Sequence, residues 1–270
     1  MRVAGGRYYV AAAYISHTRP PTYQSSVRAA AAAMELADTL RATFGFSVVV
    51  QIVALVLTIL ALQKDGASEL LTLILTAELI TSGVQLVWYL TVIGFYYVRK
   101  VDWVLTISLR YIDWGITTPL MIVTLNLLIL YWKDQCTALD DVWNSGSWVG
   151  GNVFALVANL VMLLCGVLVE TEKIEPEYEL TVLNWGFVPL ILAFIPSVVI
   201  VVTNYTFHAA AVVVVTVGIW SCYGGVSQAY HDQRDRKAAA FNILDVISKN
   251  VFAIAVSAIV LADDLNCGAR

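Results

Sequence analysis

Seven long apolar stretches dominate this sequence and leave few folds open to it. An apolar run of about 20 residues is long enough for a helix to cross the hydrocarbon core of a bilayer. Short polar segments separate most of the runs, for instance Lys64 to Gly66 and Glu170 to Glu179. We therefore predict an all-α membrane protein with seven transmembrane helices, at approximately 41–63, 68–97, 102–132, 147–169, 180–203, 207–230 and 238–262.

Composition supports a membrane protein. The 270 residues are 59% hydrophobic and only 13% charged, whereas a soluble domain has about 25% charged residues. We expect one membrane domain over 41–262, between an N-terminal tail at 1–40 and a short C-terminal tail at 263–270. The first 40 residues lack the apolar core of a signal peptide, which favours the tail.

The remaining composition argues against several classes of protein. The net charge of −4 is small, which speaks against a nucleic-acid partner. The histidines and cysteines are scattered, without the spacing of a metal site. We find no enzyme motif. We therefore expect no metal site and no enzymatic activity. The expected surroundings of the chain are the lipid bilayer.

Lys249 lies within the last apolar stretch, where a charge is unfavourable. A lysine at the centre of a membrane helix costs about 2.5–3.5 kcal/mol. Asp245 precedes it by four residues and so shares its helix face. One interpretation is a structural ion pair. The other is a lysine that carries a covalent cofactor as a protonated Schiff base, with Asp245 as its counterion.

The third apolar stretch carries a second set of charges. Arg110, Asp113 and Thr117 are spaced i, i+3, i+7 and form one stripe along a helix. Charged residues inside a membrane helix face the interior of the bundle and pair there. We expect Asp113 to be a second counterion for Lys249, with Arg110 balancing the additional negative charge.

Two motifs in these stretches resemble the microbial rhodopsin family. They are Arg-Tyr-x-Asp-Trp-x-x-Thr-Thr-Pro-Leu from Arg110 to Leu120, and Leu-Asp-Val-x-x-Lys from Leu244 to Lys249. The resemblance extends over all seven stretches. It implies a seven-helix bundle around all-trans retinal, which is bound to Lys249. It also implies a retinal pocket that includes Trp114, Thr117, Thr118, Met162, Gly166, Trp185, Trp220 and Tyr223.

Within this resemblance, Trp114 and Trp220 would lie on the two faces of the retinal chain, and Thr118 would face Asn159. One departure concerns the sixth stretch. Gly224 and Ser227 stand where the family usually has proline and often tryptophan. The pocket is therefore expected to be roomier, or differently shaped, at the end that holds the retinal ring.

The resemblance leaves the function open among pumps, channels and sensors. Archaeal-type outward proton pumps carry a carboxylic proton donor in the third helix, and the matching residue here is Thr124. This argues against efficient proton pumping. Sodium and chloride pumps replace Asp113 or Thr117, and this chain keeps both. A weak proton pump remains an alternative.

Three residues resemble the central constriction of channelrhodopsins: Ser47, Glu78 and Asn250. The sequence around Glu78 resembles the natural anion channelrhodopsins in particular, and few carboxylates line its helix. We therefore predict a light-gated channel for chloride or another small anion. Other interpretations are a structural role for Glu78 and a packing role for Ser47. Alternative functions are a light-gated cation or proton channel, or a sensory rhodopsin that binds a partner through 133–147.

The resemblance also implies an orientation. It places the Arg110 end of the bundle, and hence the N-terminus, on the extracellular side of the plasma membrane. It also implies a homodimer. The basic residues at that end, such as Arg234 and Lys237, would then lie outside, against the positive-inside tendency. We follow the motif, because the order from Arg110 to Asp113 fixes the direction of its helix.

Overall fold

The computed structural model describes residues 23–98, 103–135, 137–203, 207–231 and 233–262. Within this part of the chain, six long helices and one composite helix form the bundle. The six are α1 (Tyr23–Leu62), α2 (Glu69–Val98), α3 (Trp103–Lys133), α5 (Gly146–Glu170), α6 (Pro176–Thr203) and α7 (Phe207–Ala229). The seventh consists of α8 (Arg234–Asp245), η1 (Val246–Val251) and α9 (Phe252–Ala262), and a short helix α4 (Leu139–Asn144) precedes α5.

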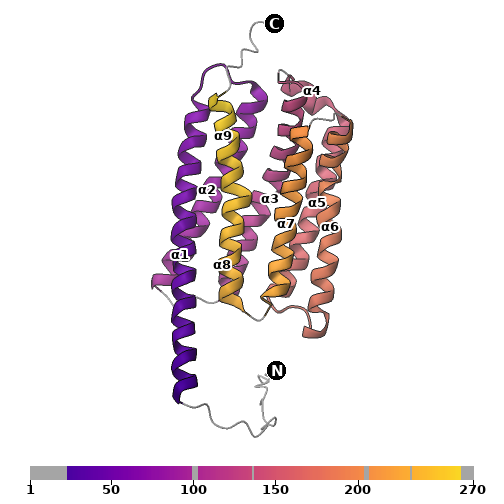
Figure 1. Ribbon diagram of the computed structural model, residues 1–270. Coiled ribbons are helices and arrows are strands. Elements are labelled where there is room, and N and C mark those ends of the chain that lie inside the picture. Colours follow the sequence, from indigo (N-terminus) through magenta and orange to yellow (C-terminus); the bar gives the residue numbers. More distant parts are fainter. Residues whose placement is uncertain (1–22, 99–102, 136, 204–206, 232, 263–270) are drawn as a thin grey trace, which may run out of the picture.

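The long helices run alternately up and down side by side (Figure 1). Helix α1 packs against α2 and against the composite helix, α2 packs against α3, and α5 packs against α6. Helix α3 lies centrally, with contacts to α2, α5, α6 and α7. The predicted all-α bundle of seven membrane-spanning helices is confirmed.

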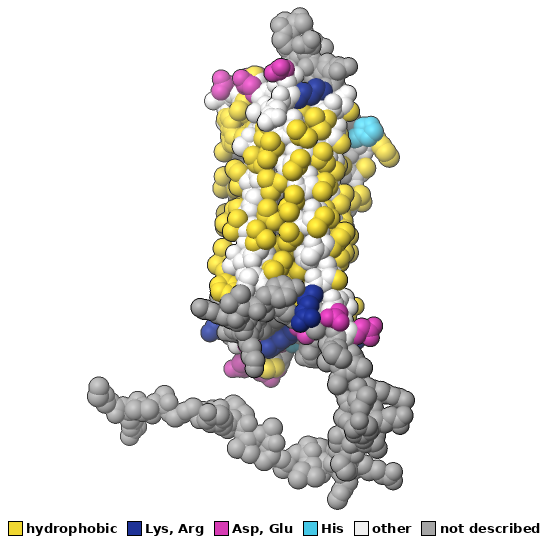
Figure 2. All heavy atoms as spheres, turned by 90° about the vertical axis from the view of Figure 1, so that its left-hand side faces the viewer, with side chains coloured by type: hydrophobic (Ala, Val, Ile, Leu, Met, Phe, Trp, Pro, Cys, Tyr) yellow, Lys and Arg dark blue, Asp and Glu magenta, His cyan; other side chains and the backbone are white. Residues whose placement is uncertain are grey.

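The outer surface of the bundle explains why these sequences form helices. Each of the seven spans has a mean hydropathy between 1.6 and 2.6 over its most apolar window. Hydrophobic side chains cover the middle of the visible face, and charged ones gather toward its two ends (Figure 2). In lipid every backbone N–H and C=O must find a partner within the segment, and a helix provides it. The chain is an integral membrane protein.

Several features differ from the prediction, among them the start of the last helix, which is Arg234 instead of 238. Helix α1 begins at Tyr23, inside the segment expected to be a tail, and residues 1–22 and 263–270 lie outside the described part. Helix α6 begins at Pro176, four residues early. A proline fits the first turn of a helix, and Glu177 and Glu179 in that turn favour the start. The polar segment 133–147 contains α4.

The composite helix changes its winding around Lys249. Its η1 segment, Val246–Val251, is a π-helix. Such wide turns inside helices occur frequently at functional sites. Three successive residues of this segment, Ser248, Lys249 and Asn250, are all buried in the bundle. The wide turn therefore sets an unusually polar part of the chain into the interior.

Two ion pairs and a histidine–carboxylate contact tie the helices together at the Arg110 end. The Nζ atom of Lys237 lies 3.0 Å from each carboxylate oxygen of Glu170, and both side chains are buried. Arg234 pairs with Glu172, and His231 Nε2 lies 2.6 Å from Glu179 Oε2. These contacts fasten the start of the composite helix and the segment before it to α5 and α6.

Candidate functional site

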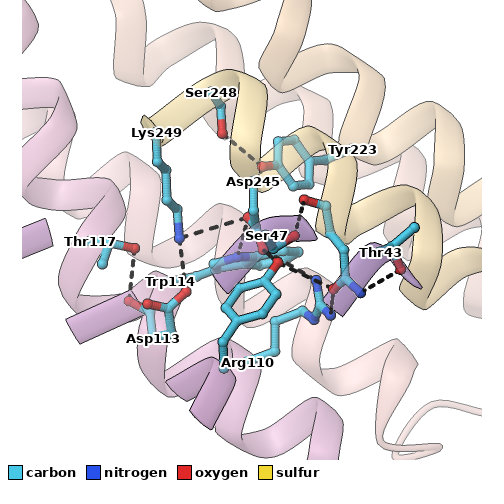
Figure 3. Close-up of polar contacts among 12 residues, drawn as sticks. Thr43, Ser47, Arg110, Asp113, Trp114, Thr117, Tyr223, Asp245, Ser248 and Lys249 are labelled. Atoms are coloured by element: carbon cyan, nitrogen blue, oxygen red, sulfur yellow. Dashed lines mark hydrogen bonds and ion pairs between the residues drawn. The ribbon is translucent and has the colours of Figure 1, made fainter. Parts of the chain in front are cut away.

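Lys249 lies in the middle of the bundle between two carboxylates (Figure 3). Its Nζ atom donates a hydrogen bond of 2.8 Å to Asp113 Oδ2 and lies 3.8 Å from Asp245 Oδ1. Lys249 is 2% exposed, Asp113 1% and Asp245 0%. The structure thus brings together the lysine and both carboxylates that the sequence indicated, from η1, α3 and α8.

Asp245 is bonded on both carboxylate oxygens. Its Oδ1 atom accepts hydrogen bonds from Tyr223 Oη at 2.9 Å and Trp114 Nε1 at 3.2 Å. Its Oδ2 atom accepts from Arg110 Nη1 and Tyr89 Oη, each at 3.3 Å. Four donors and the Arg110 charge stabilise the ionised form of a carboxylate. Asp245 is therefore held in place by residues from α2, α3 and α7.

Asp113 is bonded differently. Its Oδ2 atom accepts from Lys249, whereas Oδ1 has no hydrogen-bond partner although it is buried. The hydroxyl of Thr117 donates to the backbone carbonyl of Asp113 at 2.9 Å. A carboxylate whose only strong partner is a protonated amine is well placed to accept the proton from that amine. Of the two carboxylates beside Lys249, Asp113 is thus the one that is free to accept this proton.

Arg110 is held by a polar network around Asn242. Its Nη2 atom donates to Asn242 Oδ1 at 2.9 Å, and the single hydrogen of the Tyr89 hydroxyl is shared between this oxygen, at 3.2 Å, and Asp245 Oδ2. Asn242 Nδ2 donates to Thr43 Oγ1 at 3.1 Å, and Ser47 Oγ donates to the Asn242 carbonyl at 3.4 Å. Four helices, α1, α2, α3 and α8, meet at this asparagine.

Sequence reasoning missed Asn242 and Tyr89. Asn242 stands three residues before Asp245 and so lies on the same helix face, which was a usable signal. The guanidinium of Arg110 also lies 4.6 Å from the centre of the Trp88 ring, within cation–π range. We call this part of the interior, from Lys249 toward Arg110 and Asn242, the Arg110 side.

A cavity extends from Lys249 between α3, α5, α6 and α7. It contains about 760 Å³ of empty space, counted with its opening, and two tryptophans, Trp114 and Trp220, line it. Six residues of the predicted pocket are part of its wall: Trp114, Thr118, Met162, Gly166, Trp220 and Tyr223. Thr117 is fully buried but is not part of this wall.

Trp185 requires a correction. It was expected in the pocket, but its side chain is 66% exposed on the outer surface of α6. Gly186 and Phe187 line the cavity from this helix instead. Successive residues of a helix point about 100° apart, so an error of one or two positions turns a pocket residue into a lipid-facing one.

Two glycines shape the wall of the cavity. A Cβ atom at Gly166 would collide with the Tyr111 hydroxyl, and one at Gly224 would collide with the Phe187 ring. Phe187 therefore fills the space beside Gly224. The pocket is differently shaped there rather than simply roomier, and Ser227 adds a polar group to the wall.

Thr118 and Asn159 lie together as expected. Asn159 Nδ2 donates to Thr118 Oγ1 at 2.8 Å, and Thr118 donates to the carbonyl of Trp114 at 2.7 Å. The pair joins α3 to α5 beside the cavity. A movement of the cavity wall at Trp114 would therefore be transmitted to α5 through these two hydrogen bonds.

Beyond Lys249, away from Arg110, the interior contains unpaired polar groups. Glu78, Thr81, Ser82 and Gln85 lie on α2 at helical spacing, each at most 1% exposed. The carboxyl, hydroxyl and amide groups of these side chains have no hydrogen-bond partner, and the same holds for Gln51 on α1 and Asn250 on η1. Buried polar groups are normally bonded, so such a group of exceptions requires an explanation. We call this region the Glu78 side.

The heights of these residues in the bundle can be read from their neighbours. Tyr89 bonds to Asp245 and is therefore level with it. Gln85 is one turn before Tyr89 in α2, and Lys249 is one turn after Asp245 in the composite helix, which runs in the opposite direction. Gln85 is therefore level with Lys249 and Asn250. Glu78 lies about 16 Å from Tyr89 along the helix. Across from it lies the Thr124 hydroxyl of α3, which donates its own hydrogen to the Leu120 carbonyl at 2.8 Å and so gives none to Glu78.

The predicted constriction is therefore not assembled as expected. Ser47 bonds to Asn242 on the Arg110 side, about 12 Å along the helix from Asn250. Glu78 lies on the opposite side of Lys249. Ser47, Glu78 and Asn250 occupy three levels, because local motifs do not fix how neighbouring helices are aligned along their axes. At the level of Asn250 the buried polar residues of α1 and α2 are Gln51 and Gln85.

Solved structures with the same fold share little sequence with this chain. The viral rhodopsin OLPVRII is 20% identical with a TM-score of 0.68, covering 82% of this chain and 96% of that one. Bromide-bound halorhodopsin from Halobacterium salinarum is 16% identical with a TM-score of 0.66, covering 87% and 99%. A light-driven proton pump from Leptosphaeria maculans is 18% identical with a TM-score of 0.61, covering 82% and 95%.

No family model matches the chain, and no curated protein matches it. The structural likenesses establish the microbial rhodopsin fold. At these identities the fold alone is shared, so the activity must be argued from the residues around Lys249.

Proposed function

We propose that the chain is a retinal-binding photoreceptor that transports ions across a membrane when illuminated. The observation that carries this proposal is Lys249, buried at the end of a cavity and placed between Asp113 and Asp245. A structural ion pair would need one carboxylate. Two carboxylates, with Arg110 beside the second, suit a cationic group that must stay charged in a dry site and later lose its charge.

The cavity fits an elongated apolar cofactor. Aromatic and aliphatic side chains form most of its wall, and Trp114 and Trp220 contribute flat faces suited to a conjugated chain. The glycines at 166 and 224 give space to Tyr111 and Phe187 rather than to the cofactor. All-trans retinal, joined to Lys249 as a Schiff base, would supply absorption of visible light and a light-driven isomerisation.

The chain's own residues determine what a displacement of Lys249 Nζ would do. Asp113 and Asp245 hold its proton in the dark. A shift of Nζ away from Asp113 would break the 2.8 Å hydrogen bond. Because Asn250 follows Lys249 directly, the same shift would move the Asn250 amide. Light absorption is thereby coupled to the polar groups of the Glu78 side.

Addition of all-trans retinal to the purified protein tests the attachment. We expect a visible absorption band in the wild type and none in Lys249→Ala. Lys64→Ala is the matched control, since Lys64 bonds to the α9 carbonyls of Val260 and Leu261. Lys64→Ala should keep the band. A band of full intensity in Lys249→Ala would refute the attachment site.

For the mode of transport we propose light-gated conduction of small anions such as chloride. The supporting observation is a set of three buried amides that have no hydrogen-bond partner: Gln51, Gln85 and Asn250. They lie at about the level of Lys249. We call them the amide trio. Neutral amides can donate hydrogen bonds to a partly dehydrated anion, whereas rings of carboxylates favour cations. The amide trio takes the place of the Ser47–Glu78–Asn250 constriction.

Voltage-clamp recording from membranes that contain the protein and retinal tests this mode. A light-gated channel gives a photocurrent whose direction reverses with voltage. A current of one direction at every voltage would indicate a pump, and no current from a retinal-loaded protein would indicate a sensor.

By the resemblance, the Arg110 end faces outward in the plasma membrane and the protein is a homodimer.

A further inference from the structure

Glu78 has surroundings that a purely structural carboxyl would not have. It is 0% exposed, and neither of its carboxyl oxygens has a hydrogen-bond partner. No ion pair found among the described residues includes it. A carboxylate without a cation or a donor is strongly disfavoured in a dry interior. The geometry therefore suits a neutral carboxyl that holds its proton.

The place of Glu78 relative to Lys249 gives this proton a use. Asp113 accepts the Lys249 hydrogen bond from the α3 side, and Asp245 belongs to the Arg110 network. Glu78 lies beyond Lys249, beside Thr124. A proton that Nζ gives to Asp113 can thus be replaced from a different carboxyl, on the other side of the lysine.

We propose that Glu78 is the internal proton donor that returns a proton to Lys249 after light has driven the first proton to Asp113. The O–H bond of Glu78 breaks, an N–H bond forms at Nζ, and Glu78 becomes a carboxylate that regains a proton from water at the near end of α2. The proposal rests on the proposed function in one respect, because Lys249 must carry a cofactor that responds to light.

The distance between donor and acceptor is covered by other polar groups. Thr124 stands eleven residues after Asp113, about 16 Å along α3, so one direct transfer is too long. Thr81, Ser82 and Asn250 lie between the two levels and are buried without partners. A hydroxyl can donate and accept at once, and buried polar groups of this kind normally bind water. They form a path for the proton.

This inference revises the argument from Thr124. A threonine on α3 indicated that no carboxylic donor was present, but the carboxyl at this level comes from α2. The exchange can be tested directly, because the two residues face each other. The double variant E78T/T124D moves the carboxyl across to α3 and leaves the pair otherwise similar.

Time-resolved absorption of the retinal-loaded protein in lipid vesicles measures how fast Lys249 regains its proton. We expect Glu78→Gln to slow this step about 100-fold. Glu69→Gln is the control, because Glu69 is exposed on the same helix. E78T should be as slow as Glu78→Gln, and E78T/T124D should recover most of the rate. An unchanged rate in Glu78→Gln, or a wild type in which Lys249 never loses its proton, would overturn the proposal.

Infrared difference spectroscopy tests the donor without relying on the rate. The wild type should lose the C=O stretch of a protonated carboxyl while Lys249 regains its proton, and Glu78→Gln should lack this signal. In cofactor-free protein the same C=O stretch should be present and should disappear in Glu78→Gln. An ionised Glu78 there would refute the donor even if retinal does not bind. A protein that fails to bind retinal but keeps the band would refute only the proposed function.

Discussion

The two sides of Lys249 differ in how their buried polar groups are satisfied. On the Arg110 side, Asp245 and Asn242 bond to residues from α1, α2 and α3, and Arg110 has a partner for both Nη1 and Nη2. Among the residues described there, Trp88 Nε1 is unpaired. On the Glu78 side, the carboxyl, hydroxyl and amide groups of Glu78, Thr81, Ser82, Gln85, Gln51 and Asn250 are equally buried but unpaired. Other buried groups beyond Lys249 are paired: Thr58 with Ser257, and Asn126 with Asn152 and Ser197. The first arrangement resists change, and the second can accept an ion, a proton or water. The difference indicates a rigid side and a responsive side.

The largest effect on this comparison is expected from Asp245→Ala. It removes the charge that Arg110 Nη1 bonds at 3.3 Å and leaves a buried guanidinium. Breaking a buried ion pair from one side costs about 3–5 kcal/mol. Thermal unfolding in detergent should show a large fall in Tm. Glu69→Ala, at an exposed position on α2, should leave Tm nearly unchanged. An equally stable Asp245→Ala protein would contradict the rigid Arg110 side.

A smaller loss is expected from Asn242→Leu. This change removes the acceptor of Arg110 and Tyr89 and the donor to Thr43. Leaving buried donors without a partner costs about 1–3 kcal/mol. The same unfolding measurement should therefore give a lower Tm than the wild type. A neutral result would mean that Arg110 finds other partners easily.

Gln51→Met should have the opposite sign. Both polar atoms of Gln51 are buried and unpaired, and replacing an unsatisfied group by an apolar one of similar shape is nearly neutral or stabilising. We expect Tm to stay or to rise while the photocurrent falls. A clear loss of stability would show that Gln51 has partners and that the two sides are alike.

The smallest effect is expected at the cavity wall. Gly224→Ala places a Cβ against the Phe187 ring, whereas Gly225→Ala meets nothing within 4 Å. Overpacking costs about 1–3 kcal/mol when the neighbour cannot move, but a single aromatic ring can yield partly. Gly224→Ala should bind retinal more slowly and shift its absorption band, and Gly225→Ala should do neither. Identical spectra would remove Phe187 from the cofactor site.

The sequence predicted the fold and the centre of the site well, for physical reasons. Apolar length specifies membrane helices, and a charge inside such a helix must find a partner. Lys249, Asp113, Asp245 and Arg110 could therefore be placed together before any coordinates. Their spacing along each helix showed that Arg110 and Asp113 share one helix face and that Asp245 and Lys249 share another.

The errors have a common cause. Trp185 was assigned to the pocket although it faces outward, and Ser47 and Glu78 were assigned to one level although Lys249 separates them. Both assignments depend on the rotation and alignment of whole helices, which arise from packing between helices. A motif describes only neighbours along the chain. Asn242 was missed because its partners come from three other helices.

The proposed conduction of anions by a responsive Glu78 side is tested most directly by one measurement. The photocurrent of the retinal-loaded protein should be recorded at two chloride concentrations on one side of the membrane. The account predicts a reversal potential that shifts with the chloride gradient. A reversal potential that ignores chloride and follows protons or sodium, or a photocurrent that never reverses, would contradict it.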